Sequence, residues 1–138
     1  MFNIIVAADK EQWEGNTGRF SLYEKPRFGE FSGDEFRSAG ISLKKAASLK
    51  ALEGIPTLLI YENRPEPYAR TVRVVTLRDI ILKRDEITFG IDPVGKIPRE
   101  YALNNGQLLQ ADRDEFSRTH WAVKDGKLPL NPSAVTEA

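Results

Sequence analysis

Apolar positions recur along the chain in patterns that predict six strands. Residues 2–8 form an apolar run rich in β-branched side chains, typical of a strand covered on both faces, and 57–61 form a second run of strand type. Alternation of apolar and polar positions predicts the others. In the clearest case, Ile87, Phe89 and Ile91 face one way. The alternating segments are 19–25, 70–78, 86–92 and 116–124.

The strand expected over 70–78 changes its apolar parity between Val74 and Val75. A β-bulge has this effect, because one extra residue moves every later side chain to the opposite face. We therefore predict a bulge at this step. After the bulge, the apolar side chains of Val75 and Leu77 must be covered by another surface. Another subunit is one candidate for that surface.

Short helices are predicted between the strands. A single helical turn that carries Trp13 follows the first strand. Ser32 and Glu35 form a capping box for a helix over 33–39, and a stripe of apolar positions predicts a longer helix over 43–53.

A last helix is predicted from Pro98 to Asn104. Proline suits the first helical position, and Asn105-Gly106 suits a left-handed stop. The alternative is that this Asn-Gly pair closes a β-hairpin.

These elements lack regular β-α-β alternation. They predict an α+β fold with a curved, largely antiparallel sheet or partly closed barrel of about six strands, with three or four short helices. The alternative is a three-layer arrangement around a mixed sheet. The 138 residues are enough for one domain, which we place at 1–127, and 128–138 are expected to be a flexible tail.

The amino-acid composition excludes several classes of functional site. Lysine and arginine total 20, as do aspartate and glutamate, so the net charge of zero excludes a histone-like polycation. The absence of cysteine excludes disulfides, thiolate metal sites and cysteine nucleophiles, and a single histidine cannot build a multi-histidine metal site. Phosphate-binding loops of the GxxxxGK[ST] type, dinucleotide fingerprints, HExxH and GxSxG are absent, and we expect no cofactor and no bound metal.

The amino-terminal run is short and has no positive charge before it, so we expect no signal peptide. No stretch reaches the roughly 20 apolar residues of a membrane span. The expected location is therefore the cytoplasm.

Two basic segments are candidates for an anion-binding surface. The first, 64–84, contains six cations and two carboxylates; Arg73 and Arg78 are the cations that we assign to the site. The alternative without a ligand is a solvated face whose arginines protect an exposed edge strand from pairing with other chains.

The second segment contains the only histidine. In a strand, Arg118, His120 and Lys124 share one face, while Trp121 and Val123 share the other, which we assign to the core. A cationic stripe of this kind suits an anionic ligand, and a histidine within it is a candidate general base or acid. The simpler alternative is a histidine that only makes structural hydrogen bonds.

Two further segments have simple interpretations. The acidic run 111–115 holds three carboxylates but lacks the full calcium-loop pattern, so we interpret it as a solvated loop or helix cap. Trp13 lies beside the glycine-rich turn 15–18 and is assigned to the end of the core, with a pocket wall as the alternative.

Several strings along the chain resemble a small bacterial domain of unassigned function. They are Trp13-Glu14, the segments 49–62 and 87–93 and, most specifically, Thr-His-Trp-Ala-Val-Lys-Asp at 119–125. The resemblance covers nearly the whole chain. Such segments occur beside TIR-type and other effector domains in bacterial defence-like proteins, which implies a bacterial protein with a defence-linked role. No effector domain is attached here, so the chain would act alone or with a separately encoded partner.

Our main hypothesis is a non-enzymatic binding or sensor module. It would recognise an anionic ligand, a nucleic acid or a partner protein through Arg118, His120 and Lys124, extended by Arg73 and Arg78.

One alternative is a metal-independent nuclease or phosphodiesterase that uses His120 with Glu86 or Glu100. The other is a structural or assembly protein that forms homo-oligomers.

Overall fold

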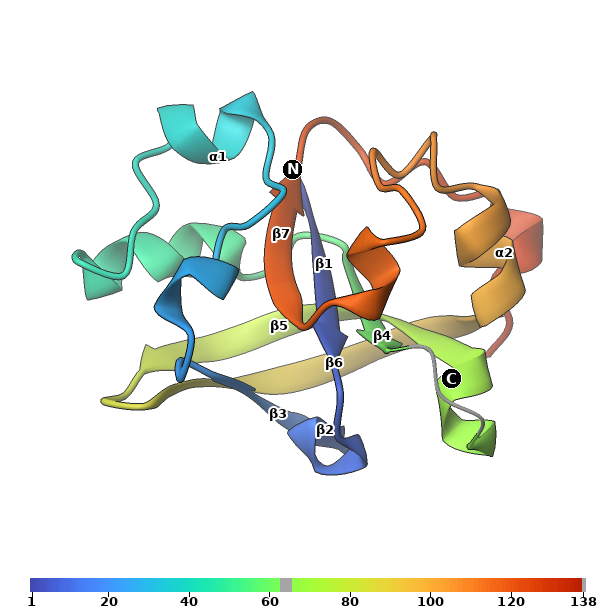
Figure 1. Ribbon diagram of the computed structural model, residues 1–138, viewed down its shortest axis with the longest axis horizontal. Coiled ribbons are helices and arrows are strands. Elements are labelled where there is room, and N and C mark those ends of the chain that lie inside the picture. Colours follow the sequence, from blue (N-terminus) through green and yellow to red (C-terminus); the bar gives the residue numbers. More distant parts are fainter. Residues whose placement is uncertain (63–65, 138) are drawn as a thin grey trace.

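The computed structural model describes residues 1–62 and 66–137, which form a seven-stranded mixed sheet (Figure 1). The strand order is β2-β3-β6-β5-β4-β1-β7. β1 and β4 are parallel, and the other neighbours are antiparallel. The strands are β1 (Phe2–Ala7), β2 (Trp13–Glu14), β3 (Thr17–Ser21), β4 (Thr57–Tyr61), β5 (Thr71–Leu82), β6 (Glu86–Pro98) and β7 (His120–Lys124).

The helical segments are short. The α-helices are α1 (Asp34–Ser38) and α2 (Arg99–Asn104), and the 3-10 turns are η1 (Lys10–Gln12), η2 (Lys25–Arg27), η3 (Ala46–Leu52), η4 (Pro67–Arg70), η5 (Glu115–Ser117) and η6 (Pro132–Ala134). The predicted α+β class is confirmed. The sheet has seven strands rather than six and is not closed, because its order ends at β2 and β7.

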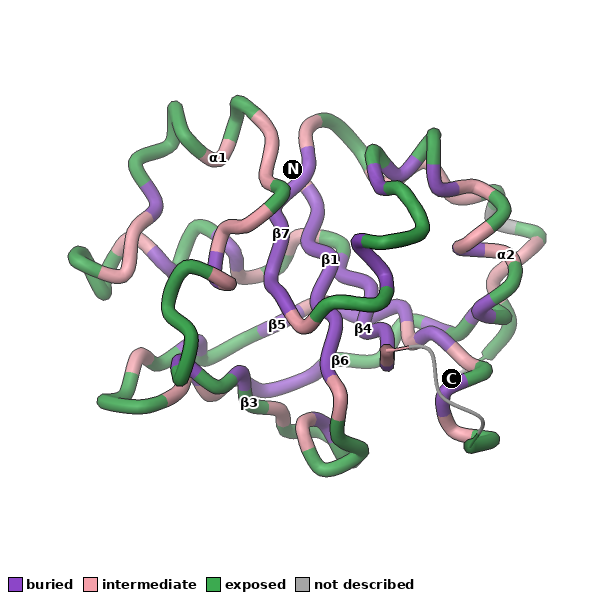
Figure 2. Tube along the Cα trace, viewed as in Figure 1, coloured by how far each residue is buried: buried purple, intermediate pink, exposed green. Residues whose placement is uncertain are grey.

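Both faces of the sheet are covered, as in the three-layer alternative. Side chains alternate along each strand, so β1 sends Ile5 into one core and Ile4 into the other. The first core lies under η3 and the segment around Phe28, and the second under α2 and η5. Every residue of β1, β4 and β7 is buried, which confirms the two buried strands predicted from the apolar runs (Figure 2).

Trp121 shows that the sheet curves around the first core. Its ring lies 5.7 Å from the rings of both Phe20 and Phe89, measured between centroids, although β3 and β6 are near the opposite end of the strand order. In Figure 1, β1 and β7 run across the direction of the long β5–β6 hairpin. Strong twist therefore brings distant strands to one shared core.

The bulge predicted in β5 is confirmed. The pairing with β6 shifts register between Val74 and Val75, so Val74 enters the second core and Val75 the first. Val75 and Leu77 are buried within this chain, where η3 packs against β5. They therefore leave no apolar face for another subunit to cover.

Three helix predictions need correction. Trp13 belongs to β2, the additional strand, rather than to a helical turn. Of the helix predicted over 43–53, only Ala46–Leu52 is helical, and it is the 3-10 helix η3. The Ser32 hydroxyl accepts a bond from the Val123 amide rather than capping α1. The amides of the first turn of α1 instead bond to the Asp125 carboxylate, which is distant in sequence.

Two predicted boundaries also change. The last strand begins at His120 rather than at residue 116, because η5 precedes it. The helix after Pro98 is confirmed as α2, but Asn105 has φ −110°, so the stop is not left-handed there. Gly106 is needed for a close approach: an added Cβ would lie 2.5 Å from the carbonyl oxygen of Ala111.

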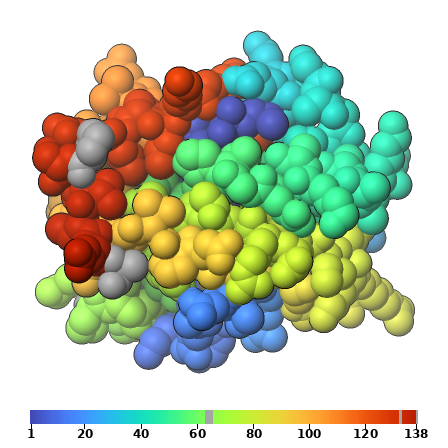
Figure 3. Space-filling model, turned by 180° about the vertical axis from the view of Figure 1, so that it is seen from behind, coloured from blue at the N-terminus to red at the C-terminus, as the bar shows by residue number. Residues whose placement is uncertain are grey.

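The carboxyl-terminal segment lies beside the last part of β6 (Figure 3). Leu128, Leu130 and Val135 pack against the second core, and Thr136 exchanges both backbone hydrogen bonds with Lys96 of β6. The flexibility expected of 128–138 concerns motion and stays a prediction. Within the described residues, no helix has the length and apolar character that crossing a membrane would require.

Candidate functional site

Three buried ionisable side chains meet beneath the surface beside β7. Glu115 Oε1 lies 2.9 Å from Lys124 Nζ, and Glu115 Oε2 lies 3.2 Å from His120 Nε2. His120, Lys124 and Glu115 are 0%, 2% and 3% exposed. We call these three residues the buried charge cluster.

The local sequence explains how the cluster forms. His120 and Lys124 are four residues apart on one strand, so they point to the same face, as predicted. Glu115 comes from η5, whose first turn is held by a hydrogen bond from the Glu115 amide to Asp112 Oδ1. The Glu115 carboxylate therefore contacts both the His120 and the Lys124 side chains.

Lys124 also joins two loops that flank the cluster. Its Nζ donates to the carbonyl oxygens of Phe31, at 2.7 Å, and Gln110, at 2.8 Å. With Glu115, these acceptors use all three ammonium donors. The lysine thus satisfies its buried charge completely while holding the two loops together.

Both of these loop residues have an unusual backbone conformation. Phe31 has φ 62° and Gln110 has φ 60°, and only one other non-glycine residue in the described part of the chain has a positive φ. Such conformations strain side-chain-bearing residues, and they cluster at ligand sites in folded proteins. The strain here occurs at the two carbonyls that accept from Lys124.

A hollow opens above the cluster, between the two loops. Its volume is about 770 Å³, and Lys124 and Glu115 form its floor. Phe31, 46% exposed, contributes an aromatic ring that also lies edge-on to His120, with 5.1 Å between the centroids. Polar groups around the wall are supplied by Asn104, Gln107, Gln110, Asp112 and Arg113.

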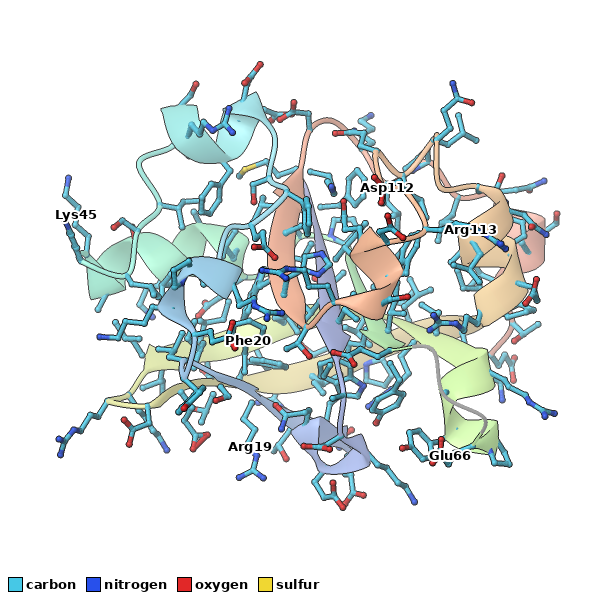
Figure 4. All side chains as sticks on the ribbon, viewed as in Figure 1. Arg19, Phe20, Lys45, Glu66, Asp112 and Arg113 are labelled. Atoms are coloured by element: carbon cyan, nitrogen blue, oxygen red, sulfur yellow. The ribbon has the colours of Figure 1, made fainter. Side chains whose placement is uncertain are left out.

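Arg113 is the exposed cation of this hollow. It forms no ion pair with any residue that the structure describes. Figure 4 shows Arg113 and Asp112 on the segment between α2 and β7. The hollow therefore combines a guanidinium, an aromatic ring and amide side chains above a buried charged floor.

The structure places the remaining predicted site residues elsewhere. Arg118 is exposed and paired with Glu30 through two hydrogen bonds, of 2.6 and 3.0 Å. Hydrogen bonding from Arg118 lowers the pKa of Glu30, so this pair stays ionised at neutral pH. Arg118 lies next to the cluster in sequence, but its charge is already compensated.

Arg73 and Arg78 do not join His120 and Lys124. Both lie on β5, which β4 and β1 separate from β7 in the sheet. Arg73 donates to the Gly15 carbonyl oxygen, and Arg78 pairs with Asp79 and Asp92. These hydrogen bonds raise the pKa of Arg78 above its usual value. Arg64, in the same predicted basic segment, lies outside the described residues.

The catalytic alternative gains no geometric support. Both ring nitrogens of His120 are engaged inside the protein, by Glu115 and by the Arg118 carbonyl oxygen. Glu86 begins β6, and Glu100 is exposed on α2. Neither carboxylate is bonded to His120 in the described part of the chain.

The carboxylates of the acidic run 111–115 lie in two different environments. Asp112 and Asp114 are exposed, whereas Glu115 is buried in the cluster. Within the described residues, no three His, Asp or Glu side chains are grouped closely enough to hold a metal ion. Glu115 is thus the site residue that sequence reasoning missed. It lies in a run interpreted as solvated, and no local pattern distinguishes it from Asp112 and Asp114.

Comparison with protein-family models, with curated proteins and with solved structures finds no match to this chain. The resemblance seen at 119–125 therefore stays a prediction. The features of the chain that bear on function are the hollow and the buried charge cluster beneath it.

Proposed function

We propose that the protein is a non-enzymatic binding module whose ligand site is the hollow above the buried charge cluster. The observation that carries this proposal is the pair of strained residues, Phe31 and Gln110, held by one buried lysine at the floor of an open hollow. Residues stay in such strained backbone conformations only where the surrounding contacts hold them, and these places are often ligand sites.

The groups around the hollow favour a nucleotide unit of a single-stranded nucleic acid as ligand. Arg113 offers its guanidinium to a phosphate, and the exposed ring of Phe31 offers a surface to a base. Asn104 and Gln107 supply both donors and acceptors, which match the edges of a base. The volume lies within the range of about 300–1,000 Å³ that is common for small-ligand sites.

The resemblance to domains beside TIR-type effectors would place this module in a bacterial defence-like system. In that setting, nucleotide binding would act as the sensing step. The nuclease alternative would need His120 to reach a substrate, and its burial argues against that role.

Calorimetric titration with an RNA dinucleotide of two adenosines joined by one phosphodiester tests the proposal. We expect binding by the unaltered protein, and about tenfold weaker binding or more for Arg113→Ala, since a charge-assisted hydrogen bond contributes about 1.5–3 kcal/mol. Phe31→Asn should also weaken binding, because asparagine tolerates a positive φ but lacks the ring. Arg84→Ala, at the exposed turn between β5 and β6, is the matched control and should bind normally.

Two results would overturn the proposal. If the dinucleotide does not bind, the ligand class is wrong. If it binds equally well to the Arg113 and Phe31 variants, the ligand lies elsewhere on the protein.

A further inference from the structure

The contacts of His120 determine the position of one proton. Its Nδ1 lies 2.5 Å from the carbonyl oxygen of Arg118, and a carbonyl oxygen only accepts hydrogen bonds. Nδ1 must therefore carry a hydrogen and donate it. In a neutral imidazole, Nε2 is then an acceptor.

The partner of Nε2 is the carboxylate oxygen Oε2 of Glu115, at 3.2 Å. An ionised carboxylate is also an acceptor only, so this contact is attractive only when a proton lies between Nε2 and Oε2. This geometry favours a His120–Glu115 pair that holds one proton beyond the neutral histidine and the ionised glutamate. Whichever of the two atoms carries it, the charge of the pair is the same.

This proton sets the charge beneath the hollow. Lys124 contributes +1, and the protonated His120–Glu115 pair contributes zero, so the cluster carries +1 with the proton and zero without it. All three residues are at most 3% exposed, so water screens this charge weakly.

We propose that the hollow binds its anionic ligand together with the proton shared by His120 and Glu115. This inference rests on the proposed function, because it concerns the same hollow. An anion above a floor of charge +1 is bound more tightly than one above a neutral floor. By linkage, the ligand in turn makes the pair retain its proton to higher pH.

Other charged groups around His120 do not change this count near neutral pH. Glu30 and Arg118 neutralise each other, and Arg27 lies close enough to act on Glu30. At the hollow, Asp112 and Arg113 carry opposite charges. The facing strand β1 contributes Val6 opposite His120, which is apolar.

The variant Glu115→Gln keeps the contacts of residue 115 but removes the need for the shared proton. Its amide oxygen can accept from Lys124, and its amide N–H can donate to Nε2 of a neutral His120. The contacts are then complete without the shared proton. Lys124 keeps the floor of this variant positive whether or not the pH rises.

The experiment measures dinucleotide affinity by calorimetry at about pH 6 and about pH 8, a range that spans ordinary histidine titration. The single phosphodiester of the probe keeps the same charge over this range. We expect the unaltered protein to bind roughly tenfold more tightly at the lower pH, and Glu115→Gln to bind equally at both. Titration of the unaltered protein in two buffers of different ionisation enthalpy should show proton uptake on binding.

Nitrogen-15 NMR of the His120 ring in the ligand-free protein reads the proton directly. Protonated Nδ1 and a proton on or shared by Nε2 are expected at the lower pH, with loss of the second on raising the pH. Binding that is equally tight at both pH values, or that takes up no proton, overturns this inference and leaves the proposed function standing. Absence of binding at either pH overturns the proposed function, and this inference with it. The two-buffer and NMR measurements need no variant, so misfolding of Glu115→Gln does not affect them.

Discussion

Lys124 and Arg118 each hold a glutamate, and burial makes the two pairs unequal. Lys124 is 2% exposed and bonds to Glu115, Phe31 and Gln110, whereas Arg118 and Glu30 form their pair at the surface. Removing Lys124 would leave three acceptors inside the protein without their shared donor, while exposed pairs contribute little because water replaces the contact. The stability of the molecule therefore depends on the first pair far more than on the second.

We predict that Lys124→Met lowers the free energy of unfolding by about 3–5 kcal/mol. Glu115 would lose its lysine partner, and the carbonyl oxygens of Phe31 and Gln110 would lose their shared donor. Arg118→Met is the matched control and should change the free energy by about 1 kcal/mol or less. Urea unfolding of the two variants measures the difference. Equal losses would show that the buried cluster has no special structural weight.

At the scale of elements, the carboxyl-terminal segment closes one side of β6. Gly95 permits this approach, because a Cβ added there would lie 2.5 Å from the Thr136 carbonyl oxygen and from Val135 Cγ1. The Thr136 atom that the added Cβ would meet is a backbone atom, and it cannot move away as the end of a flexible side chain can. The packing of the carboxyl-terminal segment against β6 therefore depends on Gly95.

Gly95→Ala should release the segment from β6. The Thr136 amide, which donates to the Lys96 carbonyl oxygen at 2.9 Å, should then exchange its hydrogen about tenfold faster or more. Hydrogen exchange followed by NMR measures this rate. Lys127→Ala, an exposed change just before the segment, should leave it unaltered. Unchanged exchange in Gly95→Ala would mean that Thr136 is not held by this contact.

At the scale of the whole molecule, β7 connects the two cores. Trp121 enters the first core and its neighbour Ala122 the second. The Trp121 indole also donates to Asn3 Oδ1 of β1, at 3.0 Å. Since one strand contributes to both cores, we expect them to unfold together in a single cooperative transition.

Trp121→Phe tests this coupling. The variant keeps an aromatic ring but leaves Asn3 Oδ1 buried without its donor, which costs about 1–3 kcal/mol. The unfolding midpoints followed by far-ultraviolet circular dichroism and by Trp13 fluorescence should fall by the same amount. Separate midpoints would show that the two cores unfold independently. Leu108→Ala, an exposed apolar position, serves as the control.

Local alternation of apolar and polar positions was enough to predict several features of the fold. The parity change at Val74 and Val75 predicted the bulge, because a strand presents successive side chains to opposite faces whatever its neighbours are. The same rule placed His120 and Lys124 on one face of β7 and Trp121 on the other. The apolar runs of β1 and β4 likewise indicated burial before any neighbour was known.

The groups that those faces contact depend on how the whole chain folds. Periodicity along β7 cannot show that Glu115 lies between His120 and Lys124, since this contact depends on how η5 folds back over the strand. The cap of α1 by Asp125 and the separation of Arg73 from the cluster have the same origin. Local pattern specifies the direction of a side chain, whereas burial, pairing and proton count depend on groups brought together from distant positions in the chain.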